Sequence, residues 1–295
     1  MSQTTAFKIE RIDPFGVEVF IDARQPLDTE AAAAFRELFY REKLILIRGQ
    51  HNLPEADLDR LTSYVGPLLD KEKEYSEIAA DAGLGDGPLA YHSDLSFTTA
   101  PYTALALHAL DLVEGESYTR FANSVLAVDR ISPQLRTRVE HMKALAILSA
   151  DQSRRAVPFS ASDFFPQVER DAIIPHAVTG EPVLYVTEMH TAQIGSLAQP
   201  ESEAVLKELF SILYADDNVY EHVWREGDLV LWDNIALQHS RPDLAGCTAR
   251  RLRRATIATQ NFYDLCPQFD HNDPRFQAWS RGDQDAFAEL ELESS

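Results

Sequence analysis

The first third of the chain alternates between two spacings of hydrophobic residues. In residues 15–21, apolar side chains occupy every second position, a period of two that predicts a strand. The uninterrupted apolar run 44–47 predicts a short buried strand. Apolar residues at helical spacing follow Thr29, a suitable N-cap, and a second amphipathic helix is predicted to have Pro54 in its first turn. This third therefore mixes helices with strands.

From residue 89 onward the pattern is mainly that of short strands separated by turns. Helices are predicted to interrupt it near 124–141 and 201–214. The segments 178–182 and 225–228 each contain a glycine and are typical of hairpin turns. This pattern of short strands and turns predicts a mainly β fold, a sandwich or a jelly roll, with flanking helices on its outside. The candidate strands cover 89–97, 103–112, 117–122, 143–149, 183–187, 218–224, 228–233 and 251–262.

The chain shows no internal repeat and no low-complexity linker, so we expect a single domain over residues 1–295. Residues 66–88 differ from their surroundings because they combine four glycines with Lys71, Lys73 and Tyr75. A long loop in a compact domain is often a lid or a binding loop. We therefore expect an active-site loop or lid here, although a plain insertion would have the same composition.

The charge balance limits the classes of partner. The chain has 27 basic and 47 acidic residues, a formal net charge of −20, which argues against nucleic acids and anionic membranes. No run approaches the roughly 20 apolar residues of a membrane span, and the start lacks the features of a signal peptide, so a cytoplasmic protein is expected. Cys247 and Cys266 are too few for a disulfide framework or a zinc site. A locally basic pocket for a small anionic molecule remains compatible with this charge.

His92 and Asp94 are the most informative polar pair. Side chains at i and i+2 of a strand point to the same face, so on the predicted strand 89–97 the two could reach one ion together. With His239, far downstream, they would make a facial triad of two imidazoles and one carboxylate, which holds Fe(II) and leaves coordination positions open. A His-x-Asp pair alone is common by chance, and the same ligand types bind other divalent metals.

Several motifs follow one another in a specific order. The strongest is Trp224-Arg225-Glu226-Gly227-Asp228-Leu229-Val230-Leu231-Trp232-Asp233-Asn234 with His239. Tyr91-His92-Ser93-Asp94-Leu95-Ser96-Phe97 precedes it, Arg253-Arg254-Ala255-Thr256 closes the series, and 16–19 and 46–50 match in part. In these motifs the chain resembles the taurine dioxygenase and 2,4-dichlorophenoxyacetate dioxygenase family of Fe(II)/2-oxoglutarate-dependent oxygenases. The resemblance covers nearly the whole chain.

The resemblance implies a double-stranded β-helix, the cupin-like jelly-roll core, and a reaction. His92, Asp94 and His239 would hold Fe(II), and O2 with 2-oxoglutarate would oxidise a C–H bond of a small organic acid or amino-acid-like substrate, leaving succinate and CO2. In related halogenases a small residue replaces the carboxylate ligand, so the presence of Asp94 favours hydroxylation. Desaturation, cyclisation and fragmentation stay open. Relatives are often dimers or tetramers, which makes a homodimer or tetramer an expectation by analogy.

The resemblance also implies a site for 2-oxoglutarate. The family's arginine for the distal carboxylate matches Arg254, and Arg250 is a second candidate because strand alternation would place both on one side. The family's threonine matches Thr119. There the chain departs from the family pattern, because 116–119 reads Glu-Ser-Tyr-Thr where the family has Gly-Gly-Asp-Thr.

The substrate is the least determined feature. The candidate contacts are Lys71, Lys73, Tyr75, Tyr91 and His190, although such residues are more often surface charges or core aromatics. Two other classes stay open: a non-oxidative cupin-like metal enzyme, such as an isomerase or hydrolase, and a binding protein that has lost catalysis. Within the family, a desaturase or cyclase of a biosynthetic pathway is the alternative.

The segment 232–234 is predicted to be structural. Trp232 is expected to pack in the core, and Asp233 and Asn234 to satisfy the turn before His239.

Overall fold

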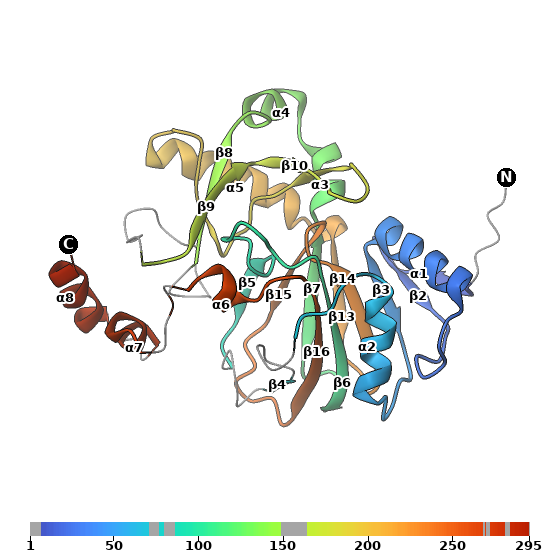
Figure 1. Cartoon of the computed structure of the whole chain (residues 1–295). Coiled ribbons are helices and arrows are strands. Elements are labelled where there is room, and N and C mark those ends of the chain that lie inside the picture. The colour runs from blue at the N-terminus through green and yellow to red at the C-terminus, as the bar shows by residue number, and fades with distance from the viewer. Residues whose placement is uncertain are drawn as a thin grey trace.

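Two β-sheets face each other, and helices lie on their outer sides (Figure 1). The computed structural model describes residues 7–70, 77–79, 86–148, 164–267, 269, 272–280 and 284–294. The larger sheet has the order β1-β2-β3-β14-β6-β16-β4 and the smaller one β13-β7-β15-β5. The larger sheet consists of β1 (Ile9–Arg11), β2 (Val17–Val19), β3 (Leu44–Ile47), β14 (Leu229–Asp233), β6 (Ala104–Leu112), β16 (Arg250–Ile257) and β4 (Glu77–Ala79). The smaller one consists of β13 (Val219–Val223), β7 (Tyr118–Asn123), β15 (Leu237–Arg241) and β5 (Leu89–His92).

The side chains between the two sheets form the main core. Leu107 of β6, Phe121 of β7, Trp232 of β14 and Leu237 of β15 are all buried there. This confirms the mainly β fold with flanking helices, and two facing sheets of this kind make the jelly-roll core. The strands that carry the candidate site residues, β5, β7, β15 and β16, therefore project side chains into one interior.

The strand β3 is buried on both faces. Leu44 and Leu46 face the core between the sheets, whereas Ile45 and Ile47 face a second core beneath helices α1 (Thr29–Glu42) and α2 (Glu55–Ser63). A strand covered on both sides has no need for polar alternation, which explains its uninterrupted apolar run. The buried strand 44–47 and the two helices are confirmed, but the strand expected over 15–21 is limited to 17–19, and Pro54 is the N-cap of α2, one residue before its first turn. The side chain of Asp28, not Thr29, accepts the N-terminal hydrogen bond of α1, from Ala31 N at 2.8 Å.

A further layer covers one end of the smaller sheet. Helices α3, α4 and α5 pack on two small sheets, of order β12-β8-β9 and β10-β11. The predicted helix 124–141 is in fact two helices, because the chain is extended at Ile131 and Ser132 before Pro133 starts the second one. The elements are α3 (Ser124–Arg130), α4 (Pro133–Val139), β8 (Lys143–Ile147), β9 (Gln167–Asp171), β10 (Ile173–Pro175), β11 (Pro182–Leu184), β12 (Thr191–Ile194) and α5 (Gln199–Leu213).

Three local predictions need correction. The strand expected over 89–97 ends at His92, and the one expected over 251–262 ends at Ile257. The turn 178–182 joins the β10–β11 hairpin as predicted, but 225–228 joins β13 to β14, which lie in different sheets and make no hairpin. Within 66–88, residues 77–79 form β4, which pairs with β16, and residues 71–76 and 80–85 lie outside the described residues.

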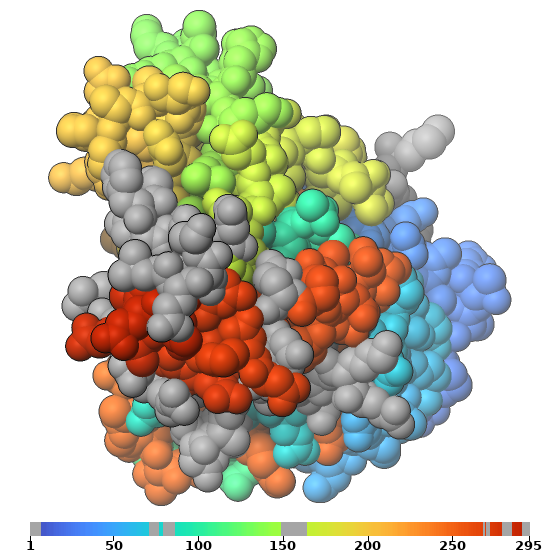
Figure 2. Space-filling view, turned by 60° about the vertical axis from the view of Figure 1, so that its left-hand side comes forward, coloured from blue at the N-terminus to red at the C-terminus, as the bar shows by residue number. Residues whose placement is uncertain are grey.

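The C-terminal segment packs beside the site through aromatic side chains. It contains α6 (Phe262–Leu265), α7 (Pro274–Ser280) and α8 (Gln284–Ser294). Phe269 stacks on Phe164 with ring centroids 4.8 Å apart, and Phe287 lies 5.5 Å from the same ring. In the space-filling view this segment, in orange-red to red, lies across part of the face turned to the viewer, below the layer that holds α5, in gold (Figure 2). Among the described residues, no helix combines the length and hydrophobicity that a bilayer crossing requires.

Candidate metal centre

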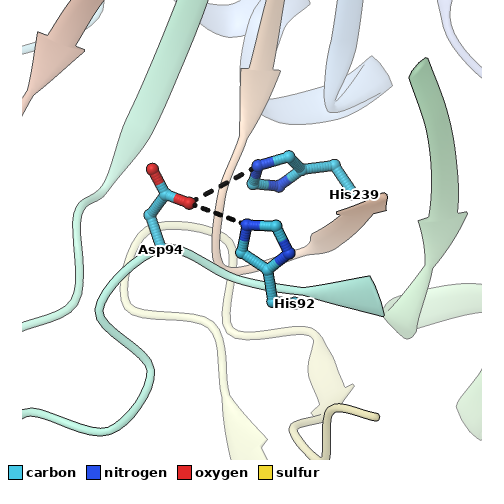
Figure 3. A group of neighbouring side chains, drawn as sticks. All are labelled: His92, Asp94 and His239. Carbon is cyan, nitrogen blue, oxygen red and sulfur yellow. Dashed lines mark ion pairs between the residues drawn. The ribbon is translucent and has the colours of Figure 1, made fainter. Parts of the chain in front are cut away.

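His92, Asp94 and His239 converge at one point of the interior (Figure 3). His92 ends β5, and His239 lies in β15 directly opposite it in the antiparallel register, with ring centroids 4.2 Å apart. Asp94 Oδ1 lies 3.3 Å from His92 Nε2 and 3.4 Å from His239 Nε2. One ligand atom from each residue lies within 4.8 Å of the others, so the three could hold one metal ion.

Asp94 reaches this point through a turn, not through strand alternation. The strand ends at His92, and Leu95 has a left-handed backbone with φ 57°. The side chain of Asn234 fixes the turn: its Oδ1 accepts from Asp94 N at 2.8 Å, and its Nδ2 donates to Asp94 O at 3.0 Å and to Tyr102 O at 2.8 Å. Asn234 is fully buried. A side chain just after β14 therefore holds the backbone of the carboxylate ligand.

The two imidazoles present the same nitrogen to the centre. His92 Nδ1 lies 2.8 Å from the carbonyl of Ala90, so Nδ1 carries the proton and Nε2 keeps its lone pair for a metal. His239 packs against the ring of Trp232 at 5.0 Å, and its Nδ1 is buried without a hydrogen-bond partner among the described residues.

The protonation states suit a cation. Burial raises the pKa of Asp94, but Arg254, with smaller contributions from His92 and His239, holds it well below its usual range. Burial, together with the neighbouring His92 and Arg254, lowers the pKa of His239 to about 3, although Asp94 acts in the opposite direction. An ionised carboxylate and a neutral imidazole are the forms that bind metal, so neither Asp94 nor His239 has to lose a proton at neutral pH.

Two arginines of β16 face the interior with different surroundings. Arg254 Nη2 donates to Asp94 Oδ2 at 2.7 Å, so this guanidinium contacts the carboxylate of the triad. Arg250, four residues earlier on the same face, is 5% exposed, and its Nε and Nη1 have no hydrogen-bond partner among the described residues. Burial, with a smaller contribution from Arg241, lowers the pKa of Arg250 to about 10. A buried cation with unused donors fits an anionic ligand.

Thr119 faces the same interior from β7. It is buried, and its Oγ1 accepts a hydrogen bond from Trp224 Nε1 at 2.9 Å. The residue patterns assigned no role to Trp224. Its hydrogen-bond partner is more than a hundred residues away, so no local pattern could indicate this contact. The one signal in the sequence was the position of Trp224 at the start of the motif 224–234.

Only one of the five candidate substrate residues is found beside the triad among the described residues. His190 lies beside the triad: its ring is 5.9 Å from that of His92, its Nδ1 is 2.9 Å from Ser96 Oγ, and burial lowers its pKa well below the usual value. Tyr91 is not brought to the triad, because it stacks on Tyr214 at 4.1 Å, on the other face of β5. Lys71, Lys73 and Tyr75 lie outside the described residues.

Buried candidate ligands inside a jelly roll, with cationic side chains in the same interior, are typical of enzymes that bind a metal and a small anionic molecule side by side. The chain belongs to the family described as taurine catabolism dioxygenase TauD, TfdA family, whose model matches residues 8–256. It is accordingly an Fe(II)- and 2-oxoglutarate-dependent dioxygenase that uses O2.

Similar proteins support the same assignment. An alkylsulfatase of Acinetobacter baylyi is 23% identical, with 79% of this chain and 78% of the relative covered. The (S)-phenoxypropionate/alpha-ketoglutarate-dioxygenase of Sphingobium herbicidovorans is 28% identical, with 79% and 88% covered. The crystal structure of a taurine dioxygenase from Burkholderia xenovorans superposes with a TM-score of 0.72 at 21% identity, covering 86% of this chain and 90% of that one. This structural likeness shows the shared fold.

Proposed function

We propose that this enzyme hydroxylates a C–H bond of a small organic acid, with Fe(II) held by His92, Asp94 and His239. Arg250 and Thr119 bind the distal carboxylate of 2-oxoglutarate. The observation that carries the proposal is the buried guanidinium of Arg250, whose Nε and Nη1 lack partners among the described residues while Arg254 is engaged by Asp94. Bound iron and 2-oxoglutarate supply the oxidant, and the protein supplies ligands, orientation and a dry cavity.

The spacing along β16 supports this division between the two arginines. Residues on a strand rise roughly 3.3 Å each, so Arg250 lies about 13 Å along the strand from Arg254. A five-carbon dicarboxylate can bind the metal with one end and reach toward Arg250 with the other. Its length and that of the Arg250 side chain together span this distance along the strand. Arg254 is too close to Asp94 to serve a carboxylate at the far end of the same molecule. The resemblance alone favoured Arg254, and the contacts favour Arg250.

The surroundings of His190 support a substrate with an apolar part. Phe97 lies 4.9 Å from the His190 ring and 6.3 Å from Phe262, which gives this side of the triad an aromatic wall. His190 is neutral, so it offers a hydrogen bond but no charge. The named substrate of one relative, (S)-phenoxypropionate, is an organic acid with an aromatic body. A small acid with an apolar group matches this wall.

The proposal is tested by binding and turnover. Anaerobic titration of the Fe(II) protein with 2-oxoglutarate should give the visible charge-transfer band of the chelate, and addition of O2 with a panel of organic acids should release succinate. Arg250→Leu should weaken 2-oxoglutarate by roughly 30-fold or more, since removing one partner of a buried charge pair costs about 2–5 kcal/mol. Arg251→Leu is the matched control, because Arg251 is exposed on the other face of β16.

Two outcomes would overturn the proposal. Wild-type protein that neither binds 2-oxoglutarate nor releases succinate would favour a non-oxidative metal enzyme. If Arg250→Leu binds 2-oxoglutarate as strongly as wild type does, another cation must bind the distal carboxylate.

A further inference from the structure

Trp224 links the end of β13 to the strand that carries Thr119. Its backbone N–H donates to the carbonyl of Ser117 at 3.2 Å, and its indole Nε1–H donates to Thr119 Oγ1 at 2.9 Å. Trp224 is fully buried and Thr119 is 3% exposed, so this side-chain hydrogen bond lies in the core between the two sheets.

The chemistry of the two groups fixes the direction of this hydrogen bond. An indole N–H can only donate, whereas a threonine hydroxyl donates one bond and accepts others. Because Thr119 Oγ1 accepts from Trp224, the hydroxyl proton points elsewhere, and within the described part of the chain no other group bonds to it. A hydroxyl that already accepts is polarised toward donating. Thr119 is therefore presented to the interior as a hydrogen-bond donor.

The indole is held in place from its other side. The ring of His222 packs edge-on against Trp224 at 4.5 Å with an interplanar angle of 89°. His222 is itself the register partner of Thr119 across β13 and β7, and its Nε2 lies 3.2 Å from Asp228 Oδ2. A rotation of the indole away from Thr119 would have to displace these buried groups, so the N–H keeps its direction.

We propose that Trp224 is a positioning residue for the co-substrate: its indole N–H directs the Thr119 hydroxyl as a donor toward the distal carboxylate that Arg250 binds. This inference rests on the proposed function. A cation and a directed O–H together match the two oxygens of a carboxylate. Trp224 therefore contributes to the selection of keto acids that carry a second carboxylate over those that do not.

The test is a double-mutant cycle on binding to the Fe(II) protein under anaerobic conditions. The ligands are 2-oxoglutarate and 2-oxobutyrate, a keto acid without the distal carboxylate. Trp224→Phe, which keeps an aromatic ring and loses the N–H, should weaken 2-oxoglutarate about three- to tenfold, as expected for one hydrogen bond. Binding of 2-oxobutyrate should be unchanged. In the Thr119→Val background, Trp224→Phe should have no further effect, because the hydroxyl that it directs is gone.

Controls separate direction of the hydroxyl from packing. Tyr118→Phe removes a hydroxyl from the neighbouring position of the same strand, where the ring lies under Arg120 on the other face, and should leave both affinities unchanged. If Trp224→Phe does not fold, 3-benzothienylalanine at position 224 keeps the bicyclic shape and loses only the N–H. Thermal unfolding of each variant reports its fold.

The outcomes distinguish this inference from the function on which it rests. An equal loss of 2-oxoglutarate binding from Trp224→Phe in the wild-type and Thr119→Val backgrounds, or a parallel loss for 2-oxobutyrate, would show that the indole acts through packing and would overturn the inference. If wild type binds 2-oxoglutarate, Arg250→Leu loses it and Trp224→Phe does not, only the role of Trp224 fails. If wild type does not bind it, the proposed function fails first.

Discussion

Arg254 and Asp94 form an ion pair in which Nη2 lies 2.7 Å from Oδ2, while the other carboxylate oxygen faces both histidines. The two oxygens of the carboxylate are thereby divided between the arginine and the metal position. An arginine that engages one oxygen limits the carboxylate to binding a metal through the other, and it fixes the side-chain rotamer. Arg254 thus contacts the carboxylate of the candidate metal ligands directly.

Arg254→Leu should therefore weaken metal binding. Loss of a group that orients a metal ligand typically costs 10–100-fold in affinity, so we expect an effect of about that size. The measurement is titration with Fe(II) or Mn(II) in the absence of 2-oxoglutarate, with the exposed Arg251→Leu as the control. An unchanged metal affinity with a raised 2-oxoglutarate requirement would instead place Arg254 at the co-substrate, as the family resemblance implies.

Asn234→Ala should destabilise the protein and the metal site together. The substitution removes three buried hydrogen bonds, two to the backbone of Asp94 and one to Tyr102. Unpaired buried groups cost about 1–3 kcal/mol each, and with partial relaxation we expect a loss of about 2–4 kcal/mol in the free energy of unfolding. Urea denaturation of metal-free protein measures it. Gln199→Ala, which removes one side-chain bond to Glu203 on α5, should cost less than about 0.5 kcal/mol.

Asn234 also shows which kind of contact the sequence pattern could not predict. The strand β14 and the burial of Trp232 were predictable because hydrophobic runs are local signals. Asp233 satisfies the following turn as predicted, since its Oδ1 accepts from Ile235 N and Ala236 N. The side chain of Asn234 instead reaches across the fold to a segment 140 residues away. No periodicity encodes a contact of that length.

The three candidate metal ligands lie together as expected, but for a partly different reason. Strand alternation was expected to align His92 with Asp94, whereas a turn with a left-handed Leu95 does so. The strand β15, which carries His239, was not predicted. It reads Leu-Gln-His-Ser-Arg, and its polar residues face a buried site on one side and the covering layer on the other. Ordered family motifs identified His239 where hydrophobic pattern could not.

Buried histidines should make the metal-free protein less stable in mild acid. Burial lowers the pKa of His222, and it lowers that of His239 to about 3, whereas an unfolded histidine titrates near 6.5. Below about pH 6.5 the unfolded chain therefore binds protons that the folded chain does not, and stability falls as the pH decreases toward the folded pKa. Each such histidine contributes up to about 1.4 kcal/mol per pH unit, and stability should level off above about pH 7.

Urea denaturation with a chelator at pH 7.5, 6.5 and 5.5 measures this slope, in a window where unfolded carboxylates, with pKa values near 4, hardly titrate. His222→Gln should flatten the slope, because it removes one buried imidazole that the unfolded chain can protonate. His141→Gln is the matched control: the His141 side chain is 89% exposed, so its replacement should leave the slope as in wild type. A slope that is the same in His222→Gln and wild type would mean that the buried imidazole of His222 takes up its proton in the folded state, with Asp228 at 3.2 Å compensating the charge.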